Sequence, residues 1–114
     1  MSLILGIDIG GSSVKAAALT KSTPANAGPS DSARVHYPAG SGADPETVGR
    51  AIAQACQPLI DRHGPPVSLG LCLPGIFDES SRTITRSVNL PHLVGHPIDS
   101  LVVSAVPRAP RARI

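Results

Sequence analysis

The sequence predicts an α/β fold, in which a mixed sheet holds three antiparallel strands and one parallel strand that is reached through a crossover helix. Three observations predict it. Apolar runs at residues 3–9 and 67–73 are typical of strands buried on both faces. Turn-forming residues divide the first part of the chain into three short strand-like segments. One amphipathic helical segment separates the third of these strands from the apolar run at 67–73, which is the fourth strand.

The first three strands are predicted to form an antiparallel meander. Residues 3–9 are nearly all apolar, and the Gly-Gly-Ser-Ser sequence at 10–13 breaks the run with a tight turn. Residues 14–19 then return as the second strand. The polar, Pro- and Gly-containing segment 20–32 is expected to be a loop, and residues 33–37 form the third strand.

A helix is predicted to begin at Asp44-Pro45-Glu46, because Asp caps free N–H groups and Pro suits the first helical position. Its apolar face consists of residues spaced by four, three and four: Val48, Ile52, Ala55 and Leu59. Pro58 is expected to kink or end the helix, and Gly64-Pro65-Pro66 to end it in any case. The strand at 67–73 would then run parallel to the first strand through a right-handed crossover.

The rest of the chain is less regular. A turn at Pro74-Gly75 introduces a hairpin region with a short strand at 83–85, and Asp99 lies at the start of a second helix. Residues 1–105 are expected to form one incomplete lobe. The Arg-, Pro- and Ala-rich segment 106–114 has no amphipathic pattern and is expected to be disordered.

The composition excludes several classes of function. The net charge is +2, but Arg108, Arg111 and Arg113 supply three of the ten basic residues, so the body has seven basic against eight acidic residues. A nucleic-acid partner would need clustered Lys and Arg, which are absent. No signal peptide is recognisable, and no apolar run approaches the ~18 residues of a membrane helix. The expected location is cytoplasmic, without a membrane partner.

The two cysteines and the nearest histidine pair match no metal or redox motif. Cys56 and Cys72 each lie in an apolar context and are predicted to be reduced, buried thiols. His92 and His96 are four residues apart but lack a third ligand, so they are interpreted as loop histidines.

The first chemically suggestive motif spans residues 8–15. Its glycines permit positive φ and close backbone approach, its successive N–H groups can form an anion-binding nest, and its serines add donors. An Asp at the strand tip can hold a water on phosphate-bound Mg²⁺. The candidate cofactor-binding residues are Asp8, Gly10, Gly11, Ser12, Ser13 and Lys15. An ordinary hairpin turn remains an alternative for the motif, as does a solvated strand position for Lys15.

The second motif runs from the strand at 67–73 to Asn89. Gly75 would let the backbone approach a hydroxylated ring, and Asn89 offers the donor and acceptor that sugar recognition needs. The candidate substrate-binding residues are Pro74, Gly75 and Asn89. A plain turn at Pro74-Gly75 and a turn-capping Asn89 remain the alternatives.

Both motifs resemble the ROK (repressor, ORF, kinase) family of sugar kinases, within the actin-like ATPase superfamily. The segment ILGIDIGGSSVKAAAL is similar to the family's first phosphate motif, and SLGLCLPGIFDESSRTITRSVNLP to the segment that borders its sugar pocket. The matching positions of the second segment are Gly70, Pro74, Gly75, Asp78, Asn89 and Leu90.

The resemblance covers roughly residues 3–100 and implies an incomplete ribonuclease H-like N-terminal lobe. It also implies phosphoryl transfer to a hexose such as glucose, with ATP and Mg²⁺ as cofactors, although a polyphosphate donor stays open. Small-molecule sugar and nucleotide would be the partners, and homo-oligomers would form only in the full-length protein.

The family's later motifs do not occur in this sequence. The resemblance places the catalytic base in an Asn-Asp pair, followed by a Glu-x-Gly-His motif, a Cys-rich zinc motif and a second lobe. Asp99 lies too early in the chain to be that base. The resemblance therefore implies no catalytic residue and no kinase activity for this chain by itself.

Three alternatives stay open at this point. The chain can be a non-catalytic truncated or frame-shifted ROK-like protein, or a sugar-sensing ROK regulator without its DNA-binding domain. An activator ATPase or a type III pantothenate kinase would share the first motif, but the second motif argues against both.

Overall fold

The computed structural model describes residues 3–20 and 28–114. Within these residues, six strands, two α-helices and two short 3₁₀ helices follow one another. They are β1 (Leu3–Ile9), β2 (Ser13–Thr20), β3 (Asp31–His36), η1 (Gly40–Gly42), α1 (Pro45–His63), β4 (Pro66–Cys72), β5 (Ile76–Asp78), β6 (Thr83–Arg86), η2 (Pro91–Leu93) and α2 (Ile98–Ala105).

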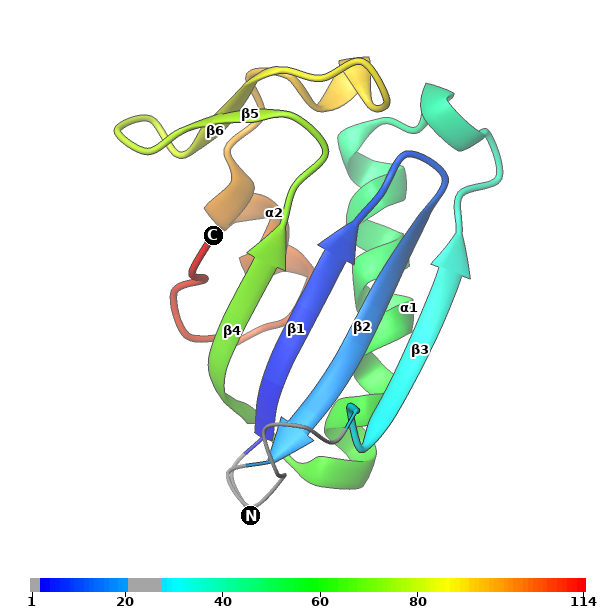
Figure 1. The fold of residues 1–114 in the computed structure, drawn as a ribbon, viewed down its shortest axis with the longest axis vertical. Coiled ribbons are helices and arrows are strands. Elements are labelled where there is room, and N and C mark those ends of the chain that lie inside the picture. Colours follow the sequence, from blue (N-terminus) through cyan, green and yellow to red (C-terminus); the bar gives the residue numbers. More distant parts are fainter. Residues whose placement is uncertain (1–2, 21–27) are drawn as a thin grey trace.

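Strands β1 to β4 form one mixed sheet in the order β3-β2-β1-β4, as Figure 1 shows. β1 and β2 are antiparallel, β2 and β3 are antiparallel, and β4 runs parallel to β1. The predicted meander, the crossover helix and the parallel fourth strand are thus confirmed. β5 and β6 form a separate antiparallel hairpin that lies beyond the carboxyl ends of β1 and β4 (Figure 1).

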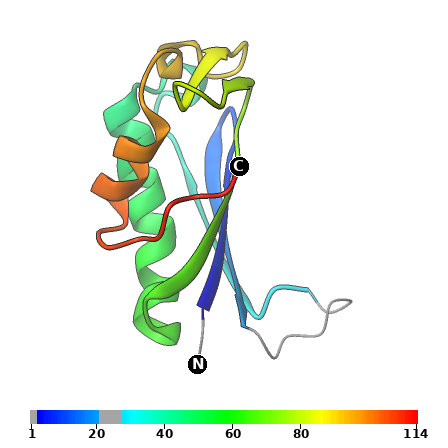
Figure 2. The same ribbon diagram turned by 90° about the vertical axis from the view of Figure 1, so that its left-hand side faces the viewer.

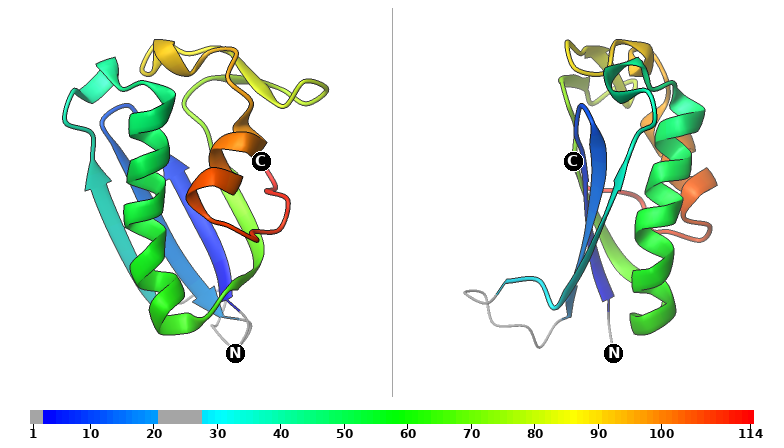
Figure 3. Two further views of the ribbon diagram at one scale, coloured as in Figure 1. Left: turned by 180° about the vertical axis from the view of Figure 1, so that it is seen from behind. Right: turned by 90° about the vertical axis from the view of Figure 1, so that its right-hand side faces the viewer.

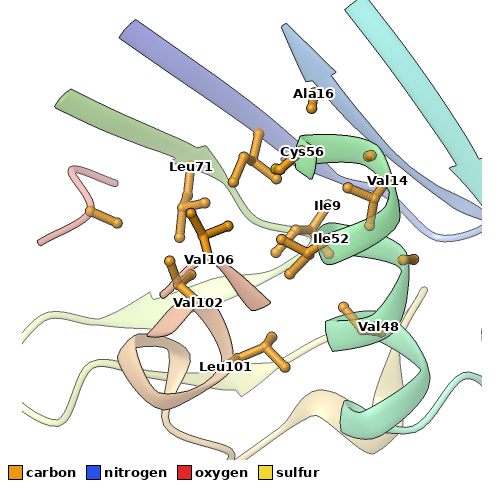
Figure 4. Close-up of a cluster of buried hydrophobic side chains, with 14 of the residues drawn as sticks. Ile9, Val14, Ala16, Val48, Ile52, Cys56, Leu71, Leu101, Val102 and Val106 are labelled. Atoms are coloured by element: carbon orange, nitrogen blue, oxygen red, sulfur yellow. The ribbon is translucent and has the colours of Figure 1, made fainter. Parts of the chain in front are cut away.

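Both helices cover the same face of the sheet (Figure 2). Seen from behind, α1 lies across β2 and β3, and α2 lies beside it (Figure 3). Side chains that alternate along the strands, such as Leu5, Ile7 and Val14, are buried beneath the helices. Figure 4 shows Ile52 of α1 and Leu101 of α2 in this apolar cluster. No described element covers the opposite face of the sheet (Figure 2).

Helix α1 begins as predicted, because the Asp44 side chain accepts a hydrogen bond of 2.8 Å from the Thr47 amide. All four residues of the predicted apolar face are fully buried: Val48, Ile52, Ala55 and Leu59. Pro58 does not end the helix, which was one of the two outcomes expected for it. α1 continues to His63 and ends at Gly64 with φ 88°, where Gly64-Pro65-Pro66 predicts its end. Burial of Leu59 and an ion pair of 2.6 Å between Arg62 and Asp31 of β3 anchor the turn beyond Pro58.

The hairpin is joined to α2 by Arg82, whose guanidinium stacks 5.6 Å from the Phe77 ring centroid. Its Nε and Nη2 atoms donate to the two carboxylate oxygens of Asp99, at 3.0 and 2.9 Å. Arg82 also donates to the Ala112 carbonyl at 2.9 Å. This bidentate pair holds the pKa of Asp99 below its usual value and ties three separate segments together.

Residues 106–114 lie against the body of the protein, which differs from the expected disordered tail. Val106 and Ala112 are buried. The Arg113 amide donates to the Leu69 carbonyl at 2.8 Å, and the Arg113 carbonyl accepts from the Leu71 amide at 2.7 Å. The physical reason is that β4 is an edge strand, whose unpaired backbone groups can bind a neighbouring segment whatever its side chains.

One cysteine prediction is confirmed and one was wrong. Cys56 is buried in α1, and burial raises the pKa of its thiol to about 12. Cys72 is exposed, because strand alternation places it on the uncovered face of the sheet, beside Asp8. Within residues 3–20 and 28–114, no helix is long and apolar enough to span a bilayer.

Candidate functional site

The candidate phosphate site is the tight turn between β1 and β2. The Gly10 amide donates to the Ser13 carbonyl at 2.9 Å, which closes the turn. Tyr37, directly after β3, donates from its backbone amide to the Ser12 carbonyl at 2.9 Å and from its hydroxyl to the Gly10 carbonyl at 3.0 Å. Two carbonyl groups of the turn are therefore held by Tyr37, one by its backbone amide and one by its hydroxyl.

This arrangement orients the turn's amides. In a trans peptide the C=O and N–H groups point in opposite directions, so a Gly10 carbonyl that points to Tyr37 directs the Gly11 amide away from it. No described residue accepts a hydrogen bond from the amides of Gly11 and Ser12. Adjacent free amides at the end of a strand, next to the exposed Ser12 side chain, can bind an anion.

The glycines of the turn are needed for space and not for positive φ, which corrects the sequence interpretation. The described glycines with positive φ are Gly40, Gly64 and Gly95. A β-carbon at Gly10 would lie 3.2 Å from the Ser13 carbonyl oxygen. One at Gly11 would lie 2.9 Å from the Asn89 β-carbon, which is closer than real β-carbons approach.

Asp8 and Lys15 lie beside the turn. They are Cα partners across β1 and β2, and both are exposed on the sheet face opposite α1. All six predicted cofactor-binding residues thus lie at one end of the sheet. Asp8 and Lys15 also line a shallow hollow of about 500 Å³. Its other lining residues belong to β1, β2, β4 and the C-terminal segment, among them Gly6, Gly70, Cys72 and Arg113.

The second motif forms the hairpin and the loop that follows it. The Ser87 hydroxyl donates to the Pro74 carbonyl and accepts from the Leu90 amide at 3.0 Å, so it links the start of the hairpin to the loop that carries Asn89. A β-carbon at Gly75 would lie 2.1 Å from the Arg86 carbonyl oxygen. Gly75 is therefore required by the hairpin itself, independently of any sugar.

Asn89 is exposed and contacts Gly11, so the structure joins the phosphate turn to the predicted sugar loop. Asp78, a matching position of the resemblance, accepts hydrogen bonds from the hydroxyls of Ser80 and Ser81 and from the Ser81 amide. These bonds lower the pKa of Asp78 and stabilise the tip of the hairpin.

Two residues that the sequence analysis missed support the site, Tyr37 and Ser87. Burial and the negative charge of nearby Asp8 raise the pKa of Tyr37 to about 12. A sequence signal existed for Tyr37, because a buried tyrosine needs a partner for its hydroxyl. For Ser87 there was none, since its partners come from the other side of the hairpin.

The described residues include no group of three His, Cys, Asp or Glu side chains that could hold a metal ion. His92, in η2, and His96, in the loop after it, have no such neighbours. Among the described residues, Asp8 is the carboxylate that lies beside the turn. A single carboxylate suits Mg²⁺ that arrives bound to phosphates and keeps several of its waters.

No family model and no curated protein matches the sequence. Several solved structures match the fold. An inorganic polyphosphate/ATP-glucomannokinase from Arthrobacter sp. strain KM has a TM-score of 0.77 at 24% identity, over 98% of this chain and 44% of that chain. A ROK hexokinase from Thermus thermophilus has a TM-score of 0.74 at 22% identity, over 97% and 34% of the two chains.

A ROK family glucokinase from Streptomyces griseus, in complex with glucose and AMPPNP, has a TM-score of 0.75 at 19% identity, over 99% of this chain and 32% of that chain. The chain therefore spans less than half the length of each of these three structures. The resemblance in the two sequence motifs is matched by a shared architecture: this chain has the fold of part of a ROK family sugar kinase.

Proposed function

We propose that this chain is part of a ROK-type sugar kinase, in which it binds the phosphates of the donor and one side of a hexose. The single observation that supports this best is the contact between Gly11 and Asn89. It joins a turn with free amides to an exposed side chain that can both donate and accept hydrogen bonds. Phosphoryl transfer needs the donor and the acceptor side by side.

The turn would act by position and charge. Amides of Gly11 and Ser12, with the Ser12 and Ser13 hydroxyls, would hold phosphate oxygens, and Lys15 would add a positive charge. Mg²⁺ carried by the phosphates would neutralise charge that develops during transfer, with Asp8 holding one of its waters. ATP is the proposed donor, because one similar structure contains AMPPNP and another is named for its use of ATP.

The chain by itself is proposed to lack kinase activity. Residues 84–98, which carry Asn89, contain no Asp or Glu. On either side of this segment, Asp78 is bound to serines and Asp99 is paired with Arg82. A sugar hydroxyl at Asn89 would therefore have no carboxylate from this segment to accept its proton. This observation also favours a second candidate, a ROK-like module that binds sugar and phosphate without catalysis.

The two candidates share partners. Both take a small sugar and a phosphate compound, and neither calls for nucleic acid or a membrane. A cytoplasmic location, where sugars and ATP are available, is part of the proposal. They differ in catalysis. In the first candidate, a further polypeptide completes the site for phosphoryl transfer, and in the second the chain only binds sugar and phosphate.

Calorimetric titration of the 114-residue chain with Mg²⁺ and pyrophosphate tests the proposed binding. The wild type should bind, and Asp8→Asn should lose the Mg²⁺-dependent part of the affinity. Asp61→Asn is the matched control, because Asp61 is an exposed carboxylate on α1 that bonds Gln57, away from the turn. Equal losses in the two variants, or no binding by the wild type, would contradict the proposal. Hexose-dependent formation of ADP by the chain alone would contradict its lack of activity.

A further inference from the structure

A row of basic side chains continues from the phosphate turn across the uncovered face of the sheet. Ser13 is the Cα partner of His36, and Lys15 is the Cα partner of Arg34. Paired residues of neighbouring strands share a face, so Lys15, Arg34 and His36 lie on the same side as Asp8, opposite α1. All three are exposed.

The fold does not explain why these positions are basic. Within the part of the chain that the structure describes, no ion pair or side-chain hydrogen bond uses Lys15, Arg34 or His36. Other basic residues are paired, for example Arg50 with Glu46 at 3.0 Å and Arg62 with Asp31 at 2.6 Å. Like charges directly opposite each other on neighbouring strands destabilise a sheet, so the Lys15–Arg34 pair opposes folding.

The position of the row indicates what it binds. It begins at Ser13, where the turn between β1 and β2 ends, and extends to β3, the edge strand of the sheet. Lys15 of β2 lies between Asp8 of β1 and Arg34 of β3, so the positive charge increases from β1 toward β3. An anion longer than two phosphate groups, held at one end by the turn, would meet these side chains if it extended over β2 and β3.

We propose that Lys15, Arg34 and His36 form an anion subsite, continuous with the Gly10–Ser13 turn, that binds the distal groups of an extended phosphate chain. The chain can be linear polyphosphate or the phosphate part of a nucleotide, because both present the same charged oxygens. The inference rests on the proposed function, since the turn must first hold one end of the donor.

The test is an affinity series by calorimetry at one fixed salt concentration. The probes are pyrophosphate, tripolyphosphate, a longer linear polyphosphate of defined length, and ATP. Wild-type affinity should rise with chain length. Arg34→Gln should weaken binding of the longer polyphosphate about two- to fivefold, as expected for one exposed charged contact, and leave pyrophosphate affinity unchanged. His36→Gln should act in the same direction.

Arg108→Gln is the matched control, because it removes one exposed positive charge from the segment after α2, away from β2 and β3. It should leave all four affinities unchanged. Weaker ATP binding in Arg34→Gln would identify the nucleotide as the extended donor, whereas an effect confined to the long chain would identify polyphosphate. Thermal unfolding should show that all three variants fold at least as well as the wild type.

Two results would overturn the inference. One is a wild-type affinity that does not rise with chain length, and the other is an equal loss in Arg34→Gln and Arg108→Gln. If pyrophosphate binds the wild type and responds to Asp8→Asn, the proposed function stands even when the subsite fails. If pyrophosphate does not bind at all, both fail.

Discussion

Gly11 packs against Asn89, and a β-carbon at Gly11 would stand 2.9 Å from the β-carbon of Asn89. The first residue belongs to the turn between β1 and β2, and the second to the loop after the β5–β6 hairpin. No interaction between these two segments is visible in the local sequence of either. Because the two residues are in contact, we place the phosphate donor at the turn and the sugar at Asn89 next to each other in one site.

Gly11→Ala should therefore destabilise the protein and displace the Asn89 loop. The added methyl group has to move the Asn89 backbone or the turn, and such overpacking typically costs about 1–3 kcal/mol. Denaturant unfolding measures the loss. Gly28→Ala is the control, because a β-carbon there would meet nothing within 4 Å. Equal stability of the two variants would show that the Gly11–Asn89 contact is not tight.

Gly75→Ala should destabilise the protein at least as strongly. The β-carbon would lie 2.1 Å from the Arg86 carbonyl oxygen, an obstacle of backbone atoms that cannot rotate away. We expect a loss at or above the upper end of the about 1–3 kcal/mol range. The same unfolding measurement checks it. A loss smaller than that of Gly11→Ala would contradict the described path of the hairpin.

Tyr37, the only tyrosine of the chain, gives an independent view of the turn. A spectrophotometric titration should show its phenol ionising near a pKa of about 12 and not at 10.0. The phenol of Tyr37 keeps its proton to a higher pH in the folded state than in the unfolded state. The stability that neutral Tyr37 contributes is therefore full below pH 10 and is lost between pH 10 and 12. Ionisation at the ordinary value in the folded protein would show that the hydroxyl is not buried beside the turn.

Tyr37→Phe should remove the hydrogen bond to the Gly10 carbonyl and cost about 1 kcal/mol of stability. Because the amide of Gly11 shares a peptide plane with that carbonyl, pyrophosphate affinity should fall as well. A stability loss with unchanged affinity would limit Tyr37 to a structural role.

The two thiols should react at very different rates with a thiol-specific reagent. Cys72 is exposed and should react at once, whereas the buried thiol of Cys56, with its pKa raised to about 12, should react only as the protein unfolds. Cys72→Ser should abolish the fast phase. A fast phase that persists in this variant would place Cys56 at the surface.

The elements of the fold were predictable because their signals are local. The apolar run of β1, the capping Asp44 and the spacing of Val48 and Leu59 depend only on neighbouring residues, and the structure confirms all three. Cys72 was misjudged because an apolar neighbourhood does not show which face of a strand is covered. Pro58 does not end α1, because tertiary contacts beyond it hold the last turn of the helix.

The candidate site was predictable only in part, for the same reason. The turn at 10–13 and Asn89 could be identified one by one, but their contact depends on how the hairpin folds back over the sheet. The role of Tyr37 depends on β3 lying beside β2. The C-terminal segment lies on β4 through backbone bonds of Arg113, which composition cannot reveal.

The most direct test of the account maps both ligands onto the chain by nuclear magnetic resonance. Backbone amide signals are followed while Mg²⁺-pyrophosphate, and then glucose, is added to the 114-residue protein. Pyrophosphate should shift the amides of Gly11 and Ser12 most strongly, and glucose should shift the Asn89 side-chain amide. Shifts confined to the hollow that Gly49 of α1 and Leu101 of α2 line, or no shift at Gly11 and Asn89, would contradict the proposed function.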